Sequence, residues 1–351
     1  MWPAKEAPPV KAMLLEEFGK PLAWAEVPEP RIGPRQALVQ SKANGLCATD
    51  LKIVDGLVPS AKTPLRLGHE SAGVVLEVGS DVESVRPGDR VVMVCKQTCG
   101  RCPMCRAGHE AMCLHSPGRL GFEIDGGFGE LVAVSDRNLV KVGPHVSMEA
   151  ASLIGGTLGS PLHAIRMARV EVGETAVVFG VGGLGLHALQ ILRHLGASVI
   201  GVDVKEEKLE KARELGALHT VHALREDPVK AVLGLTNGVG ADVALEIVGG
   251  AAVPPVIEQC LDLLRPGGRL VILGYHYGQV VPVDPARLVY RWLQIIASHN
   301  HSVRDVADAA SLVNDGRVQA VIAGTAPMRD ANEALAQLRA RDPVGRIVLQ
   351  W

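Results

Sequence analysis

The order of apolar and polar positions predicts short strands over about the first 150 residues. Runs rich in valine stand between turns that contain glycine and proline, a pattern typical of strands joined by tight connections. The clearest of these runs are 36–40, 72–78 and 89–94. Together they predict an antiparallel, barrel-like domain.

From about Met148 the pattern changes, because apolar strand-like runs begin to alternate with segments of helical period. Such alternation is typical of a parallel sheet with crossover helices. After about Leu293 it loosens, and we expect the C-terminal tail to return and complete the first domain. The predicted strands of this second part are 175–179, 198–202, 242–246 and 269–273, and its predicted helices include 186–195 and 206–215. The tail adds an amphipathic segment at 303–313 and a closing strand at 345–349.

Length, charge and apolar content narrow the class of protein. A chain of 351 residues is long enough for two domains. Its 36 Lys plus Arg and 38 Asp plus Glu leave a formal charge of −2, which provides no basic surface for nucleic acid or a membrane. No apolar stretch approaches the roughly 20 residues of a bilayer span. The segment before Val10 lacks the apolar core of a signal peptide, so we expect a cytoplasmic protein.

A glycine-rich turn follows the predicted strand 175–179 and precedes a helix-forming run. Its sequence fits G-x-G-x-x-G, the pattern of a dinucleotide-binding βαβ unit. The glycines permit a tight turn and a close approach to a pyrophosphate, which would lie on the helix N-terminus. The alternative is a turn that packs a helix without any ligand. The candidate cofactor contacts are Gly180, Gly182, Gly183, Leu184 and Gly185.

The next predicted strand is followed by an acidic residue, Asp203. A carboxylate there would accept hydrogen bonds from the adenosine ribose and repel a 2′-phosphate, so NAD is favoured over NADP. Lys208, about a turn further on, is a second candidate for the ribose, or else a solvated helix lysine.

Five of the seven cysteines lie between Cys95 and Cys113. Four of them form C-x2-C-x2-C-x7-C, a spacing that lets one loop surround a tetrahedral zinc ion with four thiolates and no open position. We therefore predict a structural zinc lobe at 95–113, with an iron–sulfur cluster or two disulfides as the alternatives. Cys95 lies outside the spacing and fits a small buried strand residue. The predicted ligands are Cys99, Cys102, Cys105 and Cys113.

A second candidate metal site comes from two short segments, 45–51 and 68–70. Cys47 in the first and His69 in the second could hold Zn²⁺ and leave a position for water or an alcohol oxygen. Each residue alone is more often part of a core.

Together with Asp125-Gly126-Gly127-Phe128, these motifs resemble the zinc-containing alcohol dehydrogenase group of the medium-chain dehydrogenases/reductases. The resemblance covers nearly the whole chain. It implies an α/β protein with a GroES-like β-barrel catalytic domain, residues 1–154 together with 294–351, and a Rossmann domain with a doubly wound parallel sheet, residues 155–293. It further implies NAD, one structural and one catalytic zinc per subunit, and a homodimer or homotetramer.

The resemblance also implies roles for single residues. Cys47 and His69 would bind the catalytic zinc, Asp50 would orient the site, and the Thr49 hydroxyl would pass on the substrate proton. The implied reaction moves a hydride between NAD and an alcohol or polyol, or the corresponding aldehyde or ketone.

The sequence departs from the group at the third ligand of the catalytic zinc. Where the group usually has Cys, Glu or Asp, this chain has glycine, at Gly155 or Gly156. Glu70 could replace that ligand, or it could stay beside the site and pair with an arginine. A weak or absent catalytic zinc is a further alternative. In addition, Lys52 stands where the group often has a proton-transferring histidine.

Two other functions stay open at this point. One is a quinone or activated-double-bond reductase of the same fold without zinc chemistry, which the missing third ligand favours and the presence of Cys47 and His69 opposes. The other is a nucleotide-binding protein without catalytic activity.

Overall fold

The computed structural model describes residues 9–340 and 343–351, so residues 1–8, on which the signal-peptide expectation rests, lie outside it. The chain forms two compact units. Unit 1 holds the chain up to Gly156 together with His301–Gly316 and Ile322–Trp351, and unit 2 holds Thr157–Asn300 and Arg317–Val321. The predicted domain limits, and the assignment of catalytic and nucleotide-binding roles to the domains, stay predictions. Among the helices of the described part, none has the length and apolar character that a membrane span needs.

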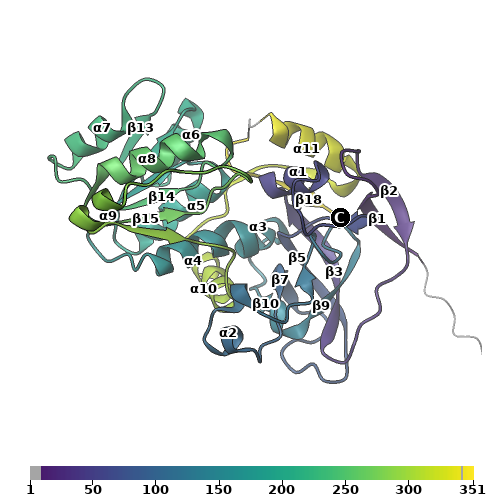
Figure 1. The fold of residues 1–351 in the computed structure, drawn as a ribbon. Helices are drawn as coiled ribbons and strands as arrows, with labels where there is room; N and C mark the ends of the chain where they lie inside the picture. Colours follow the sequence, from purple (N-terminus) through teal and green to yellow (C-terminus); the bar gives the residue numbers. More distant parts are fainter. Residues whose placement is uncertain (1–8, 341–342) are drawn as a thin grey trace, which may run out of the picture. The chain divides into compact units, whose positions relative to one another are not determined.

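Unit 1 is built mainly from antiparallel strands (Figure 1). The largest sheet has the order β10-β6-β5-β3-β18-β17, and β9 also pairs with β3. The C-terminal β18 thus pairs with β3 from the N-terminal part of the chain. A second sheet has the order β2-β1-β4, and a short β7–β8 ribbon flanks the four-cysteine segment. The strands are β1 (Val10–Leu15), β2 (Ala23–Val27), β3 (Gln36–Gly45), β4 (Leu65–Arg66), β5 (Ser71–Val78), β6 (Arg90–Met93), β7 (Lys96–Gln97), β8 (Gly118–Arg119), β9 (Leu131–Ser135), β10 (Leu139–Lys141), β17 (Ile322–Pro327) and β18 (Arg346–Gln350).

Small and β-branched residues fill the inside of this strand assembly. Inward-facing side chains of β3, β5, β6 and β9 form one buried cluster, which includes Val39, Val75, Met93 and Val132. Their alternation with outward positions is the period-2 pattern of antiparallel strands. The helices of unit 1 are α1 (Ala48–Val54), α2 (Pro103–Arg106), α3 (Met148–Leu153), α10 (Val303–Asn314) and α11 (Ala331–Arg339), with 3₁₀ turns at Glu110–Met112, Asp136–Asn138 and Met328–Asp330.

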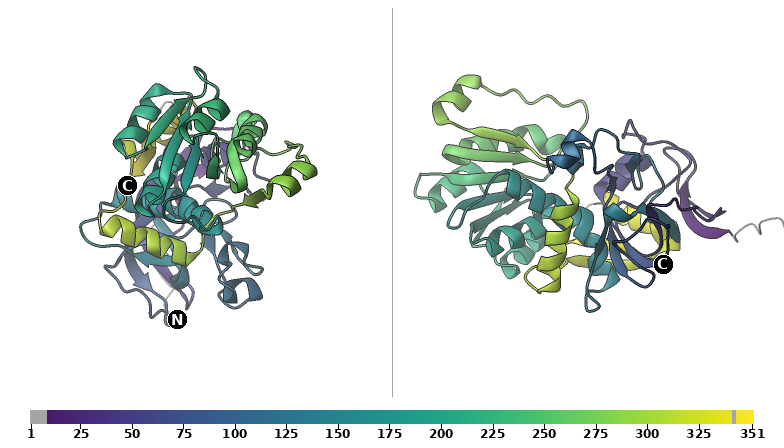
Figure 2. Two further views of the ribbon diagram at one scale, coloured as in Figure 1. Left: turned by 90° about the vertical axis from the view of Figure 1, so that its left-hand side faces the viewer. Right: turned by 90° about the horizontal axis from the view of Figure 1, so that it is seen from below.

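Unit 2 is a six-stranded parallel sheet with the order β13-β12-β11-β14-β15-β16. Helices α5 and α6 pack on one face and α7 and α8 on the other, and Figure 2 shows helices on both sides of the sheet. This is the doubly wound Rossmann arrangement. Its strands are β11 (Thr175–Phe179), β12 (Ser198–Asp203), β13 (His219–His222), β14 (Ala241–Glu246), β15 (Leu264–Ile272) and β16 (Gln294–Ala297). Its helices are α4 (Gly159–Met167), α5 (Gly183–His194), α6 (Glu206–Glu214), α7 (Pro228–Leu235), α8 (Val253–Leu263) and α9 (Pro285–Arg291), with a 3₁₀ turn at Gly250–Ala252.

The central strand β11 is apolar almost throughout because helices cover both faces of the sheet. Local signals set the helix limits. At the start of α7, the Asp227 side chain accepts hydrogen bonds from the backbone N–H groups of Val229 and Lys230, and Pro228 occupies the first helical position. Residues next to the start of α7 in the sequence therefore set where this helix begins.

Candidate metal centres and nucleotide-binding site

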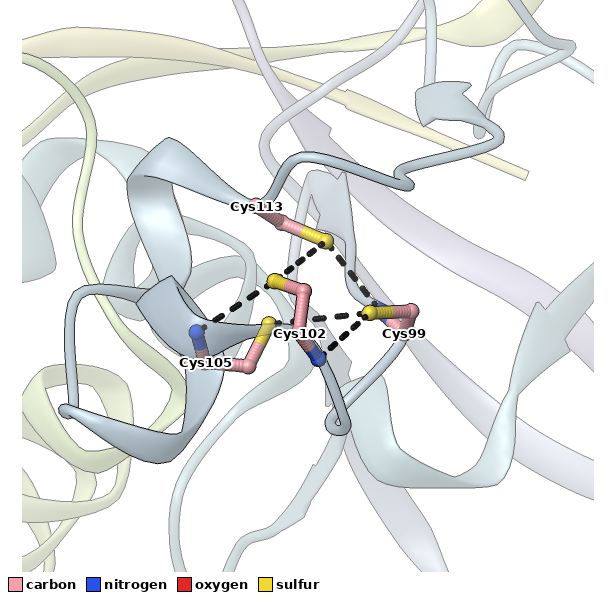
Figure 3. Close-up of side chains that lie close together, drawn as sticks. All are labelled: Cys99, Cys102, Cys105 and Cys113. Atoms are coloured by element: carbon pink, nitrogen blue, oxygen red, sulfur yellow. Dashed lines mark hydrogen bonds between the residues drawn. The ribbon is translucent and has the colours of Figure 1, made fainter.

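The four clustered cysteines converge on one point (Figure 3). Their sulfur atoms all lie within 4.8 Å of one another, and the Sγ pairs Cys99–Cys105 and Cys102–Cys113 are each 4.0 Å apart. A disulfide needs about 2.05 Å, whereas the edge of a zinc–thiolate tetrahedron is about 3.8 Å for Zn–S bonds of 2.3 Å. The sulfur positions therefore fit a single tetrahedral ion.

The charges around this cluster also fit a cation. Hydrogen bonding from the backbone N–H of Cys105 lowers the pKa of the Cys102 thiol to about 6. Burial, with other thiols close by, raises the pKa of Cys105 to about 12. A positive charge beside Cys105, such as that of a metal ion, would favour its thiolate. One guanidinium lies against the loop, since a Cβ at Gly100 would stand 2.0 Å from Arg137 Cζ.

The cysteine lobe is tied to a distant part of the chain. Glu110, in the 3₁₀ turn before Cys113, accepts a hydrogen bond through Oε2 from the backbone N–H of Val303, at 2.9 Å. Val303 is the first residue of α10, whose free N–H groups favour a carboxylate. The lobe therefore stabilises the start of this helix.

Cys47, His69 and Glu70 form the second group of metal-ligating side chains. Their ligand atoms lie within 4.8 Å of one another. Cys47 follows β3 and precedes α1, while His69 and Glu70 lie just before β5. His69 and Glu70 are buried and Cys47 is partly exposed, so a metal ion held here would be accessible from the Cys47 side only.

One carboxylate positions two of these three residues. The fully buried Asp50 accepts a hydrogen bond from the backbone N–H of Cys47 at Oδ2, at 2.8 Å, and its Oδ1 lies 3.1 Å from Nδ1 of His69. A carboxylate on Nδ1 leaves Nε2 of the imidazole for a metal. Asp50 therefore orients both candidate ligands.

The ionisation of the site is set by close charges. Burial alone would raise the pKa of the Cys47 thiol, but the Arg346 guanidinium and His69 outweigh it and lower that pKa. Burial alone would lower the pKa of His69, yet Asp50 and Cys47 hold it well above its usual value. Since a ligating histidine is neutral and a ligating cysteine is a thiolate, metal uptake would release the imidazolium proton.

Glu70 occupies a space that two glycines leave free. Its Oε1 accepts a hydrogen bond from Arg346 Nη2 at 3.1 Å, and the same nitrogen lies 3.6 Å from Cys47 Sγ. A Cβ at Gly156 would stand 2.7 Å from Oε1, and one at Gly45 would stand 2.7 Å from Oε2. Glycine at both positions is therefore what lets the carboxylate lie beside Cys47.

Of the two glycines that could match the missing ligand, Gly156 faces the site. A Cβ at Gly155 would meet Val92 and Met93 instead, at 3.5 Å or more. Both lie in a π-helical turn, Ile154–Leu158, and such turns are frequent at functional sites. The Glu70 carboxylate thus fills the place that a ligating side chain at 156 would need.

Two further candidates lie next to Cys47. Thr49, in the first turn of α1, has its Oγ1 3.6 Å from Cys47 Sγ. Burial lowers the pKa of Lys52, and the Cys47 sulfur opposes this change. Both residues stand on the helix that Cys47 precedes.

The glycine-rich turn joins β11 to α5. Gly180 has a φ of +87°, which favours glycine, and a Cβ at Gly185 would stand 2.0 Å from the Gly180 carbonyl oxygen. Gly182 is open: a Cβ there would have only Lys208 Nζ near it, at 4.0 Å. Gly183 and Leu184 form the first turn of α5. An anion at this helix N-terminus could approach the backbone closely, with the ammonium of Lys208 beside it.

Asp203 ends β12, the strand next to β11. Its Oδ1 accepts hydrogen bonds from the backbone N–H groups of Val204 and Lys205, at 2.8 and 3.1 Å. These contacts hold the carboxylate at the carboxyl edge of the sheet, where dinucleotides bind in this fold.

Comparison with known proteins decides the family. Residues 33–144 match the model of the alcohol dehydrogenase GroES-like domain, and residues 183–339 match the model of the zinc-binding dehydrogenase domain. An NAD-dependent alcohol dehydrogenase of Sulfurisphaera tokodaii is 33% identical over 97% of this chain and 99% of its own. The chain belongs to the zinc-type alcohol dehydrogenase group of the medium-chain dehydrogenases/reductases.

Other similar proteins share the fold and carry the names of different activities. The alcohol dehydrogenase of Aeropyrum pernix has a TM-score of 0.90 and 33% identity, and covers 97% of this chain and 100% of its own. An acryloyl-coenzyme A reductase of Metallosphaera sedula is 32% identical over 97% of this chain and 99% of its own. The fold class predicted for this chain, a GroES-like barrel with a Rossmann sheet, is confirmed.

At the second metal centre of this protein, the sequence did not identify the roles of Arg346 and Gly45. It also left open whether Gly155 or Gly156 matches the missing ligand. The sequence carries a signal for Arg346, because a charged residue opens an otherwise apolar predicted strand, and the structure shows that it is buried there. A buried charge needs a partner, so an acid should face it. The glycines carry no such signal, since their role depends on the position of Glu70.

Proposed function

We propose that this protein is an NAD-dependent, zinc-type dehydrogenase of alcohols or polyols that also reduces the corresponding aldehydes or ketones. The observation that carries the proposal is the meeting of Cys47, His69 and Glu70, with Asp50 fixing two of them. Thiolate, imidazole and carboxylate are all zinc ligands, and a catalytic site keeps a fourth position open.

Glu70 is the third protein ligand in this proposal. The charges of Zn²⁺, the Cys47 thiolate and the Glu70 carboxylate would sum to about zero. The charges of Arg346 and Asp50 offset one another. Zinc, when bound, supplies a Lewis acid that acidifies an alcohol or polarises a carbonyl. Asp50 orients His69, Arg346 holds Glu70 through one oxygen, and the Thr49 hydroxyl accepts the substrate proton and passes it on.

The dinucleotide site supports NAD as the hydride acceptor. The pyrophosphate would lie at Gly182 and the N-terminus of α5, and Asp203 would accept hydrogen bonds from the adenosine ribose. Lys208 Nζ lies near Gly182, on the pyrophosphate side of this site. The proposed homodimer or homotetramer follows from the resemblance and stays a prediction.

Turnover with zinc counting tests the function. A panel of alcohols, polyols and aldehydes should show NAD(H)-coupled activity in a preparation that holds two zinc ions per subunit, one for each ligand cluster. Mild chelation should remove this activity while the fold survives, because the second site offers three protein ligands and the four-cysteine cluster offers four. Activity on alcohols that is indifferent to complete removal of zinc would contradict the proposal.

A second candidate function is the reduction of an activated double bond. It is favoured by the likeness to an acryloyl-coenzyme A reductase and by glycine where a third ligand is usual. The same panel, extended by enoyl-coenzyme A thioesters and quinones, separates the two. A reductase would oxidise NADH with these substrates and show no alcohol turnover.

Replacing Glu70 by glutamine tests its role as a ligand. We expect the zinc affinity of the second centre to fall by at least the roughly 10–100-fold seen when residues that support a ligand are lost. The four-cysteine zinc should stay. Metal analysis after dialysis against a graded chelator measures this, with Glu16→Gln, an exposed glutamate in the same unit, as control. Unchanged zinc retention would place Glu70 outside the ligand set.

Replacing Asp203 by serine tests cofactor choice. Loss of the carboxylate removes both the ribose acceptor and the repulsion of a 2′-phosphate, so the preference for NAD over NADP, as a ratio of kcat/KM, should fall about tenfold or more. The exposed Glu207→Gln is the matched control on the following helix. An unaltered ratio would mean that Asp203 does not contact the ribose.

A further inference from the structure

A buried glutamate lies where the direction of the parallel sheet reverses. From β11 the chain proceeds to β12 and β13 on one side, and β14 and β15 lie on the other, so the switch point is between β11 and β14. In such sheets ligands bind beyond the carboxyl ends of the strands at this point. Glu246 is the last residue of β14 and stands opposite Phe179, the residue before Gly180. Its side chain is fully buried.

Glu246 connects two backbone segments at this edge. Its Oε1 accepts hydrogen bonds from the N–H groups of Val248 and Gly249, at 2.8 and 3.1 Å. Its carbonyl oxygen accepts from the N–H groups of Leu273 and Gly274, at 3.0 and 3.1 Å. One residue therefore holds the segments that follow β14 and β15.

The backbone of two glycines approaches the Glu246 carboxyl group and its partner segment closely. A Cβ at Gly274 would stand 2.5 Å from Glu246 Oε2 and 2.6 Å from the nitrogen of Gly249. A Cβ at Gly180 would stand 3.2 Å from Val248. Oε2 has no hydrogen-bond partner among the described residues, and burial raises the pKa of Glu246. The role of this carboxyl group is therefore to accept hydrogen bonds from the backbone.

We propose that Glu246 is a positioning residue for the nicotinamide half of the dinucleotide, an inference that rests on the proposed NAD binding. The adenosine ribose is assigned to Asp203 on β12, and the pyrophosphate to the turn after β11. The other half of an extended dinucleotide then continues over the ends of β14 and β15. The segments there, 248–249 and 273–274, are those that Glu246 holds.

Binding of NADH and ADP-ribose to the full-length protein separates this role from a general structural one. ADP-ribose has the adenosine, both phosphates and a ribose but no nicotinamide. In Glu246→Ala we expect NADH binding to weaken about tenfold or more, because two backbone N–H groups lose their acceptor, while ADP-ribose binding stays close to that of the parent protein. Glu246→Gln retains an acceptor and should restore NADH binding. Calorimetry measures both ligands, and Glu210→Ala, an exposed change in the same unit, is the control.

A second variant covers the case in which Glu246→Ala fails to fold. Gly274→Ala introduces the Cβ that meets Oε2 and should weaken NADH binding selectively in the same way. Equal losses for NADH and ADP-ribose, or no loss for NADH, would overturn the proposal. A parent protein that binds neither ligand would instead contradict the proposed function on which the inference rests.

Discussion

Replacing Cys47 by alanine is expected to remove one of two zinc ions per subunit and to lower alcohol turnover more than about 100-fold, beyond the range for residues that only support a ligand. The thiolate is one of three converging ligands, and its loss leaves His69 and Glu70 with an excess of positive charge from the metal and Arg346. Metal analysis and steady-state kinetics on one preparation measure both effects.

The matched control for this change is Cys260→Ala, which removes a buried cysteine from the other unit. It should retain both zinc ions and most of the activity. If the parent protein holds a single zinc ion and Cys47→Ala keeps it, the second metal site does not exist. Full retention of alcohol turnover by Cys47→Ala would mean that Cys47 takes no part in the reaction. NADH oxidation with enoyl-coenzyme A thioesters that Cys47→Ala leaves unchanged would point to the double-bond reductase.

Replacing Cys102 by serine should release the other zinc ion and lower the melting temperature by about 10 °C or more, since structural zinc sites contribute several kcal/mol to folding. The effect should extend beyond the lobe. Glu110 would no longer be fixed at the start of α10, so amide hydrogen exchange in the first turn of that helix should accelerate.

Cys95→Ser is the control for this second prediction, because Cys95 is buried beside the lobe but directs its Sγ to the Leu120 carbonyl, 3.5 Å away. Serine can donate the same hydrogen bond. A normal zinc content and melting temperature are expected. If Cys102→Ser had the same melting temperature as this control, the four cysteines would not hold a structural metal ion.

The sequence predicted the strands that consist of clear apolar runs. It did not predict where a strand begins when that strand contains residues typical of turns. Strand β11 has the predicted bounds, 175–179, because five apolar or β-branched residues stand between Glu174 and Gly180. In contrast, β15 starts at Leu264, before the predicted Arg269. Pro266 and Gly267 indicate a turn, yet here they form an irregularity within one strand, where the register with β14 shifts. Only the neighbouring strand reveals this continuity.

The candidate site was predictable where one residue type implies the chemistry. Cysteine spacing fixes which four sulfurs can meet, and a Cys and a His on loops before and after strands suggest a second site. The position of Glu70 was not predictable in this way. It depends on the space left by Gly45 and Gly156, which lie more than one hundred residues apart in the sequence. Space of this kind depends on how distant segments pack together, which the sequence alone does not show.

The narrow space around Glu70 also has an evolutionary consequence. A cysteine at position 156 and the present position of the Glu70 carboxylate are incompatible, because a Cβ there would stand 2.7 Å from Oε1. A lineage that gains or loses the usual ligand at 156 must therefore change position 70 as well, or move its side chain. The two positions should therefore behave as an epistatic pair.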